Sequence, residues 1–161
     1  MGKRGQIKQA PDGRLYTDES TLQISCVKGF RIRYPEFEDL LFAIPNGARI
    51  GGKIGKKGFP ILASILKAEG MTEGVPDLLL AFPTGGFAGL FIEMKTIVGS
   101  LEPEQRLKCK RLSEVGYAVA KCETADQFDR TVDAYLSEMF IQSEFWKYKR
   151  KVKNPLPGLE G

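Results

Sequence analysis

The stretch GVPDLLLAFPTGGFAGLFIEMK, residues 74–95, decides the fold. Two apolar runs flank Thr84-Gly85-Gly86, the pattern of a β-hairpin with a glycine turn. A turn centred on Gly85 pairs the strands so that Asp77 lies opposite Glu93. Because side chains alternate along a strand, Glu93 and Lys95 point to the same face. Burying charges is costly unless they are paired or bind a metal, so the hairpin predicts one site that gathers all three charged residues.

The two opposed carboxylates predict a metal site. Directly opposed residues place their Cβ atoms roughly 4.5–5.5 Å apart, and two like charges this close repel unless a cation lies between them. All-oxygen ligands favour Mg²⁺ or Mn²⁺ and are typical of metal-assisted attack on phosphate. The ammonium group of Lys95 would hold or deprotonate the attacking water, or stabilise developing charge. The alternative is a surface ion pair of Glu93 and Lys95 on an edge strand, with Asp77 merely following a proline turn.

Composition narrows the chemistry. The chain of 161 residues contains no histidine, which excludes Ser-His-Asp and Cys-His machinery and HExxH metal sites. Its three cysteines are scattered without a CxxC pair, which favours a reducing compartment and argues against zinc. The formal net charge of +4 fits a polyanionic partner. No run approaches the ~18 apolar residues of a membrane span, and the polar N-terminus lacks the pattern of a signal peptide, so we expect a cytoplasmic protein, in a bacterial cell or a phage-infected host, with no membrane partner.

The remaining elements follow from caps, breakers and periodicity. We expect one domain of α/β class, a small mixed central sheet flanked by helices, in residues 17–140, between a flexible arm, 1–16, and a basic, Pro/Gly-containing tail, 141–161. Apolar residues at helical spacing before Pro35 and a proline at the start of the 103–116 segment mark two of the helices. The expected elements are helices over 19–34, 60–70, 103–116 and 125–140, and strands over 40–44, 77–82, 90–95 and 117–122.

The hairpin charges form a recognisable pattern. Asp77 followed by Glu93-Met94-Lys95 resembles the PD-(D/E)xK nuclease signature. The wider stretch, about residues 17–137, resembles the VRR-NUC (virus-type replication-repair nuclease) family, in its stand-alone phage and bacterial type. That resemblance implies a PD-(D/E)xK restriction-endonuclease-like core. The positions that match the family pattern are Glu19, Gln23, the Pro45-Asn46-Gly47 turn, Gly74, Pro76, Asp77, Glu93, Lys95, Gln105 and Gly116.

The resemblance also implies roles. Asp77, Glu93 and the backbone carbonyl of Met94 would be metal ligands, and Glu19 would add a direct or water-mediated ligand. Lys95 would activate the water. Gln105 would help to place Lys95 or the phosphate, although Glu102, which stands where Ser or Thr usually caps the helix, predicts a weaker cap. Two of these residues have alternatives: Glu19 as a first-turn glutamate that favours the helix dipole, and Gln105 as a residue that only satisfies a helix N-terminus.

A Gly-rich basic segment, GARIGGKIGKKG at residues 47–58, predicts DNA contacts. It lacks the GxxxxGK[ST] spacing of an ATP cradle, so no nucleotide cofactor is expected. Cations on such a backbone give salt-dependent, sequence-independent affinity for phosphates, and the alternative is a solvated loop. The basic tail would add to this affinity, though charged tails are commonly only solvated. The candidate DNA-binding residues are Arg49, Lys53, Lys56 and Lys57.

We therefore predict a Mg²⁺- or Mn²⁺-dependent, structure-selective endodeoxyribonuclease. Relatives in the resembled family act in DNA repair and recombination as homodimers that cut four-way (Holliday) junctions, and a two-fold axis suits such branched DNA. The dimer surface would come from the LLFAIP or the FPILASIL segment. Two alternatives remain: a non-catalytic DNA-binding module on a nuclease fold, and a type II-like nuclease that cuts one duplex sequence.

Overall fold

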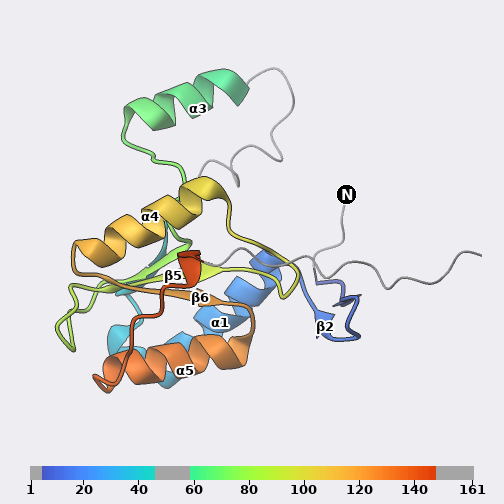
Figure 1. The fold of residues 1–161 in the computed structure, drawn as a ribbon, viewed down its shortest axis with the longest axis vertical. Helices are drawn as coiled ribbons and strands as arrows, with labels where there is room; N and C mark the ends of the chain where they lie inside the picture. Colours follow the sequence, from blue (N-terminus) through green and yellow to red (C-terminus); the bar gives the residue numbers. More distant parts are fainter. Residues whose placement is uncertain (1–4, 46–58, 148–161) are drawn as a thin grey trace, which may run out of the picture.

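The computed structural model describes residues 5–45 and 59–147, apart from the side chains of residues 59–63. Its centre is a four-stranded sheet in the order β3-β4-β5-β6. The pairs β3·β4 and β4·β5 are antiparallel, whereas β5 and β6 run parallel. The predicted small mixed sheet is confirmed (Figure 1). The strands are β3, Leu41–Ala43; β4, Leu78–Leu80; β5, Leu90–Met94; and β6, Ala118–Cys122.

The central hairpin has the predicted register. Leu78 pairs with Ile92, and Leu80 with Leu90. Its tip differs from the prediction, because the turn bridge joins Thr84 to Phe87, and both intervening glycines have positive φ angles. Three residues therefore separate the bridge from β4 but only two separate it from β5. This extra residue lies between the turn and the ladder, so it leaves the pairing near the charged residues unchanged.

Helices cover both faces of the sheet (Figure 1). Helices α1 and α5 pack on the face that carries Leu78, Leu80 and Ile92, the main apolar core. Helix α4 lies on the other face, which carries Phe91, Val119 and the short helix η2 with Trp146. The helix bounds are α1, Glu19–Arg33; η1, Pro35–Phe37; α3, Phe59–Ala68; α4, Pro103–Glu114; α5, Ala125–Leu136; and η2, Phe145–Lys147.

Side-chain caps and breakers set the helix ends. Asp18 and Thr124 accept hydrogen bonds from backbone N–H groups in the first turns of α1 and α5, which satisfies donors that have no partner inside the helix. Pro35 follows the end of α1, and Pro103 begins α4, as expected for a residue that favours the first turn and cannot donate. None of the helices described in the structure is long and apolar enough to cross a bilayer.

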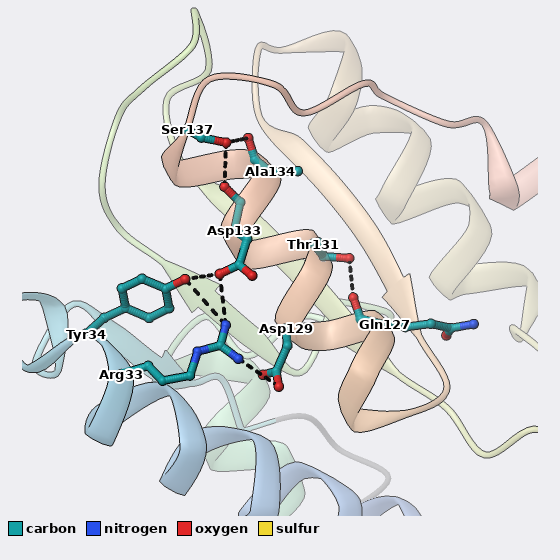
Figure 2. A network of polar contacts seen from close by, with 8 residues as sticks. All are labelled: Arg33, Tyr34, Gln127, Asp129, Thr131, Asp133, Ala134 and Ser137. Atoms are coloured by element: carbon teal, nitrogen blue, oxygen red, sulfur yellow. Dashed lines mark hydrogen bonds and ion pairs between the residues drawn. The ribbon is translucent and has the colours of Figure 1, made fainter.

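The helices α1 and α5 are joined by a polar network at their surface (Figure 2). The guanidinium of Arg33 lies 2.8 Å from a carboxylate oxygen of Asp129 and 2.8 Å from one of Asp133. The Tyr34 hydroxyl donates to the same Asp133 oxygen. These contacts join the C-terminal end of α1 to α5 on the face of the sheet that these two helices cover.

Two segments outside the predicted elements, residues 8–16 and the segment around Gln142, make defined hydrogen bonds. Residues 8–16 form an antiparallel pair, β1 (Lys8–Gln9) with β2 (Leu15–Tyr16), inside the segment expected to be a flexible arm. On the other side, the Gln142 amide both accepts from Val119 N–H at 2.8 Å and donates to Val119 C=O at 2.7 Å. A side chain thus occupies part of the open edge of β6, where an unpaired edge is otherwise exposed.

Candidate active site

The site is built where β5 ends. All five residues of β5 are buried, and Glu93 within it is 0% exposed. Lys95 follows directly, 8% exposed, and its backbone N–H donates to Cys122 C=O at 3.0 Å, so the alignment with β6 continues past the strand. Alternation puts Glu93 and Lys95 on the same face, and Lys95 Nζ lies 3.1 Å from Glu93 Oε1.

Asp77 stands just before β4, in the place where the observed register continues opposite Glu93. It is 5% exposed, and its Oδ2 atom accepts a hydrogen bond from the Met94 backbone N–H at 2.8 Å. This bond fixes the carboxylate against β5, next to the strand position that Glu93 occupies. The structure thereby brings Asp77, Glu93 and Lys95 together where the adjacent strands β4 and β5 begin and end.

Gln105 links the neighbouring helix to Glu93. It is the third residue of α4, and its Oε1 atom accepts from the Glu102 backbone N–H at 2.9 Å. Its Nε2 atom donates to Glu93 Oε1 at 2.6 Å. The helix start is thus secured from Gln105, despite the glutamate at the cap. The amide nitrogen contacts Glu93 rather than the expected Lys95, and the amide oxygen satisfies a donor at the helix N-terminus.

Gly74 explains how the loop before Asp77 fits against α4. Its φ angle is +77°, and a Cβ atom there would lie 2.5 Å from the Glu104 carbonyl oxygen. That distance is far inside van der Waals contact, and side chains rarely adopt this backbone region. Glycine therefore lets the chain that carries Asp77 pass directly against the helix turn that carries Gln105.

Glu19 reaches the site from the first turn of α1. Its Oε1 atom lies 3.9 Å from Lys95 Nζ, and a Cβ atom on Gly99 would lie 3.4 Å from that same oxygen. Gln23 lies one turn further along α1, on the same side of the helix as Glu19. It is 7% exposed, and its Oε1 atom has no hydrogen-bond partner within the described part of the chain. The sequence pattern matches Gln23 to the family but assigns it no role, since an isolated glutamine carries no chemical signature.

Burial and like charge shift the titration of the site. Burial first, and the Asp77 carboxylate second, raise the pKa of Glu93 to about 8, against a smaller lowering by Lys95. Burial alone would lower the pKa of Lys95, but the charges of Glu93 and Glu19 outweigh it, so that pKa is raised. Without a cation the site therefore favours a protonated Glu93 beside a charged Lys95.

The donor set fits a hard divalent cation. Glu93 Oε2 is completely buried and has no hydrogen-bond partner among the residues that the structure describes, which is costly for a carboxylate oxygen. A cation between Asp77 and Glu93 would satisfy that oxygen and remove their repulsion. Within the described ranges, no group of three or more His, Cys, Asp or Glu side chains gathers to hold an ion. A cation would therefore depend on two carboxylates completed by backbone oxygen and water, as Mg²⁺ sites commonly are.

Some of the predicted residues lie outside the described part of the chain. These are the turn residues Asn46 and Gly47 and the four candidate DNA-binding residues, Arg49, Lys53, Lys56 and Lys57. The basic tail after residue 147 lies outside it as well. The DNA-binding assignment of these segments stays a prediction.

Residues 54–126 match the model of the VRR-NUC domain. A solved structure described as a VRR_NUC domain protein has a TM-score of 0.62 at 19% identity, over 75% of this chain and 89% of that chain. No curated protein matches this chain. The predicted resemblance to VRR-NUC and the PD-(D/E)xK-like α/β fold are confirmed, and a VRR-NUC domain implies a nuclease of the PD-(D/E)xK type.

Proposed function

We propose that this chain, with its VRR-NUC domain, is a metal-dependent, structure-selective endodeoxyribonuclease. The observation that carries the proposal is the buried oxygen of Glu93 that lacks a partner among the described residues, beside Asp77 and Lys95. Most buried polar atoms in proteins are hydrogen-bonded, and a bound cation would give this carboxylate oxygen its partner. Metal-assisted phosphodiester hydrolysis uses a cation held by carboxylates, and this arrangement offers two carboxylates next to a positive donor.

Each residue has a role in this proposal. Asp77 and Glu93 would hold the ion, with the Met94 carbonyl as a third protein ligand and Glu19 through water. A bound Mg²⁺ or Mn²⁺ would polarise the phosphate and lower the pKa of a bound water. Lys95, whose pKa is raised, keeps its proton and donates to the attacking water or to the phosphate oxygen that gains charge. Gln105 positions Glu93 through its 2.6 Å hydrogen bond.

Within this class of nuclease, the proposed substrate is a four-way junction, and the proposed enzyme is a homodimer. The support is the resemblance to stand-alone VRR-NUC proteins, together with the match between a two-fold dimer and a two-fold substrate. The mildly basic chain, with a formal net charge of +4, suits a polyanion of any sequence. The site would work in the cytoplasm of a bacterial or phage-infected cell.

The test compares DNA structures with and without Mn²⁺. The substrates are a labelled four-way junction, a fork and a linear duplex of matched sequence, and the enzymes are wild type, Lys95→Ala and Lys110→Ala. Lys110 is a matched control, because it forms an exposed ion pair with Glu114 at 2.8 Å on the outside of α4. We expect wild type and Lys110→Ala to cut the junction only with Mn²⁺, and Lys95→Ala to lose the activity.

Other outcomes would contradict the proposal in different ways. Metal-independent, salt-sensitive binding without cleavage would indicate a non-catalytic DNA-binding module. Cleavage at one duplex sequence, indifferent to branching, would indicate a type II-like nuclease. Equal cutting by Lys95→Ala and wild type would contradict the assignment of the active site to these residues.

A further inference from the structure

A hollow of about 500 Å³ opens beside the candidate active site, between three segments. One wall is the N-terminal hairpin, with Lys8 and Tyr16, and the floor is the first turn of α1. The opposite wall includes Thr96, the residue that follows Lys95. Its volume is in the range of pockets that hold one small ligand.

The hairpin wall presents a cation and an aromatic ring side by side. Lys8 and Tyr16 are register partners across β1 and β2, so their side chains leave the same face with Cβ atoms about 4.5–5.5 Å apart. Lys8 is exposed and Tyr16 is half-buried. An aromatic ring next to a lysine is the combination that binds single-stranded nucleic acid, through stacking on a base and attraction of its phosphate.

The floor of the hollow is acidic. Asp18 is held by the Thr21 backbone N–H at 2.9 Å and the Thr21 hydroxyl at 3.0 Å. Glu19 lines the hollow and also lies 3.9 Å from Lys95 Nζ. A phosphate would be repelled by this floor, whereas the N–H edge of a nucleobase would find acceptors there.

We infer that the hollow binds one unpaired nucleobase of the DNA next to the cleaved phosphate. Tyr16 stacks on the base, Lys8 contacts the phosphate of that nucleotide, and the base edge faces Asp18. A paired base cannot enter, because its faces and its hydrogen-bonding edge are already occupied in the duplex. The hairpin thus gives the site a preference for branched or unwound DNA. This inference rests on the proposed function, since it assigns the same active site its substrate class.

The test measures binding in the full-length Lys95→Ala protein, so that no cleavage interferes. One probe is a DNA fork with 2-aminopurine as the first unpaired base, and the other is a fully paired duplex of the same length. Tyr16→Ala, Tyr16→Phe and Lys8→Ala are added to this background. Lys28→Ala is the matched control, because Lys28 is an exposed lysine on the outside of α1.

We expect Tyr16→Ala to weaken fork binding by about tenfold, the loss of one stacked base, and to abolish the change in 2-aminopurine fluorescence on binding. Tyr16→Phe should stay within about twofold of the parent because it keeps the ring. Lys8→Ala should reduce the slope of binding against salt by about one phosphate contact. Binding to the paired duplex should not change in Tyr16→Ala, and Lys28→Ala should match the parent on both probes.

Equal fork binding by Tyr16→Ala and its parent would overturn the inference, and so would an equal loss on both probes. Thermal unfolding of each variant shows whether the chain still folds. Lys8→Glu, which leaves the ring in place, gives a second measure if Tyr16→Ala does not fold; unchanged fork binding by Lys8→Glu would also overturn the inference. Failure of the nuclease proposal is separate, because it appears as intact junctions with wild type and Mn²⁺.

Discussion

Two polar networks in this protein contain the same kinds of residue but differ in burial. The network of Figure 2 joins α1 to α5 at the surface, where the side chains of Arg33 and Asp133 are 36% and 55% exposed. The network around Glu93 lies beneath α4, where the side chains of Glu93 and Lys95 are 0% and 11% exposed. Each contains a cation, a carboxylate and a hydrogen-bonding neighbour.

The difference lies in how the oxygens are satisfied. At the surface, Arg33 contacts two carboxylates, Tyr34 donates to one of them, and water can reach the rest. Exposed pairs of this kind contribute little to stability. In the buried network Glu93 Oε2 has no partner in the described structure, which costs free energy that a well-packed apolar residue would not. That oxygen would gain a partner if the proposed cation bound between Asp77 and Glu93.

The largest effect should come from Lys95→Ala. Removing the positive donor of the buried network should lower cleavage with Mn²⁺ by about 10²–10⁴-fold, the usual contribution of a group that handles protons or charge at the reacting phosphate. Single-turnover cleavage of a labelled junction measures it. If Arg33→Ala lost as much activity as Lys95→Ala, the two networks would not differ in function.

Metal binding should stabilise the protein through the buried network alone. At Mn²⁺ about 100 times its Kd, the free energy of unfolding should rise by about 2.7 kcal/mol, which moves Tm by about 5–10 °C in a chain of this size. Asp77→Asn should lose this shift, because it removes one of two carboxylate ligands. A thermal shift titration with Mn²⁺ measures it; a full shift in Asp77→Asn would place the ion elsewhere.

Gln105→Ala should reduce activity by about 10–100-fold, the usual loss when a residue that orients a metal ligand is removed. Gln127→Ala is the matched control. Its Oε1 atom also accepts a backbone N–H at the start of a helix, from Glu123 at 2.7 Å, and it has no catalytic role here. The measurement is the cleavage rate of each variant. Equal rates would mean that Gln105 acts only as a helix cap.

Glu93→Gln should stabilise the metal-free protein at high pH. Since the pKa of Glu93 rises from 4.5 to about 8 on folding, the folded state binds the proton more tightly. The free energy of unfolding then falls as the pH rises through that window. The variant does not titrate, so its free energy of unfolding relative to wild type should be higher at pH 8 than at pH 5 by on the order of 3–4 kcal/mol. Chemical unfolding with EDTA at both pH values measures it, and an equal difference at both would refute the shift.

The smallest effect should come from Arg33→Ala. Loss of the exposed contacts to Asp129 and Asp133 should lower the free energy of unfolding by about 0.5–1 kcal/mol, with no change in cleavage rate. Urea unfolding and the junction assay measure the two quantities. A loss above about 3 kcal/mol would mean that the surface network behaves as a buried one.

The sequence was enough to predict the hairpin register and several helix ends, because these depend on local pattern. Alternation about a glycine turn predicted the register that brings Asp77 beside Glu93, and Pro35 and Pro103 marked helix ends correctly. It missed the extra residue at the hairpin tip, because turn geometry depends on φ angles that several loop lengths can satisfy. It also missed the β1–β2 pair, since two-residue strands carry too little pattern to detect.

Sequence by itself determined the strands of the central sheet, the helices against it, the register of the hairpin and the identity of the charged residues, because backbone conformation and side-chain alternation are local properties. Only the tertiary structure decided that Gln105 donates to Oε1 of Glu93 and that Glu19 lies near Lys95. It also decided that Arg33 contacts two carboxylates about a hundred residues away. Such meetings depend on how whole helices pack against the sheet, and packing is settled by the shapes of all the buried side chains together.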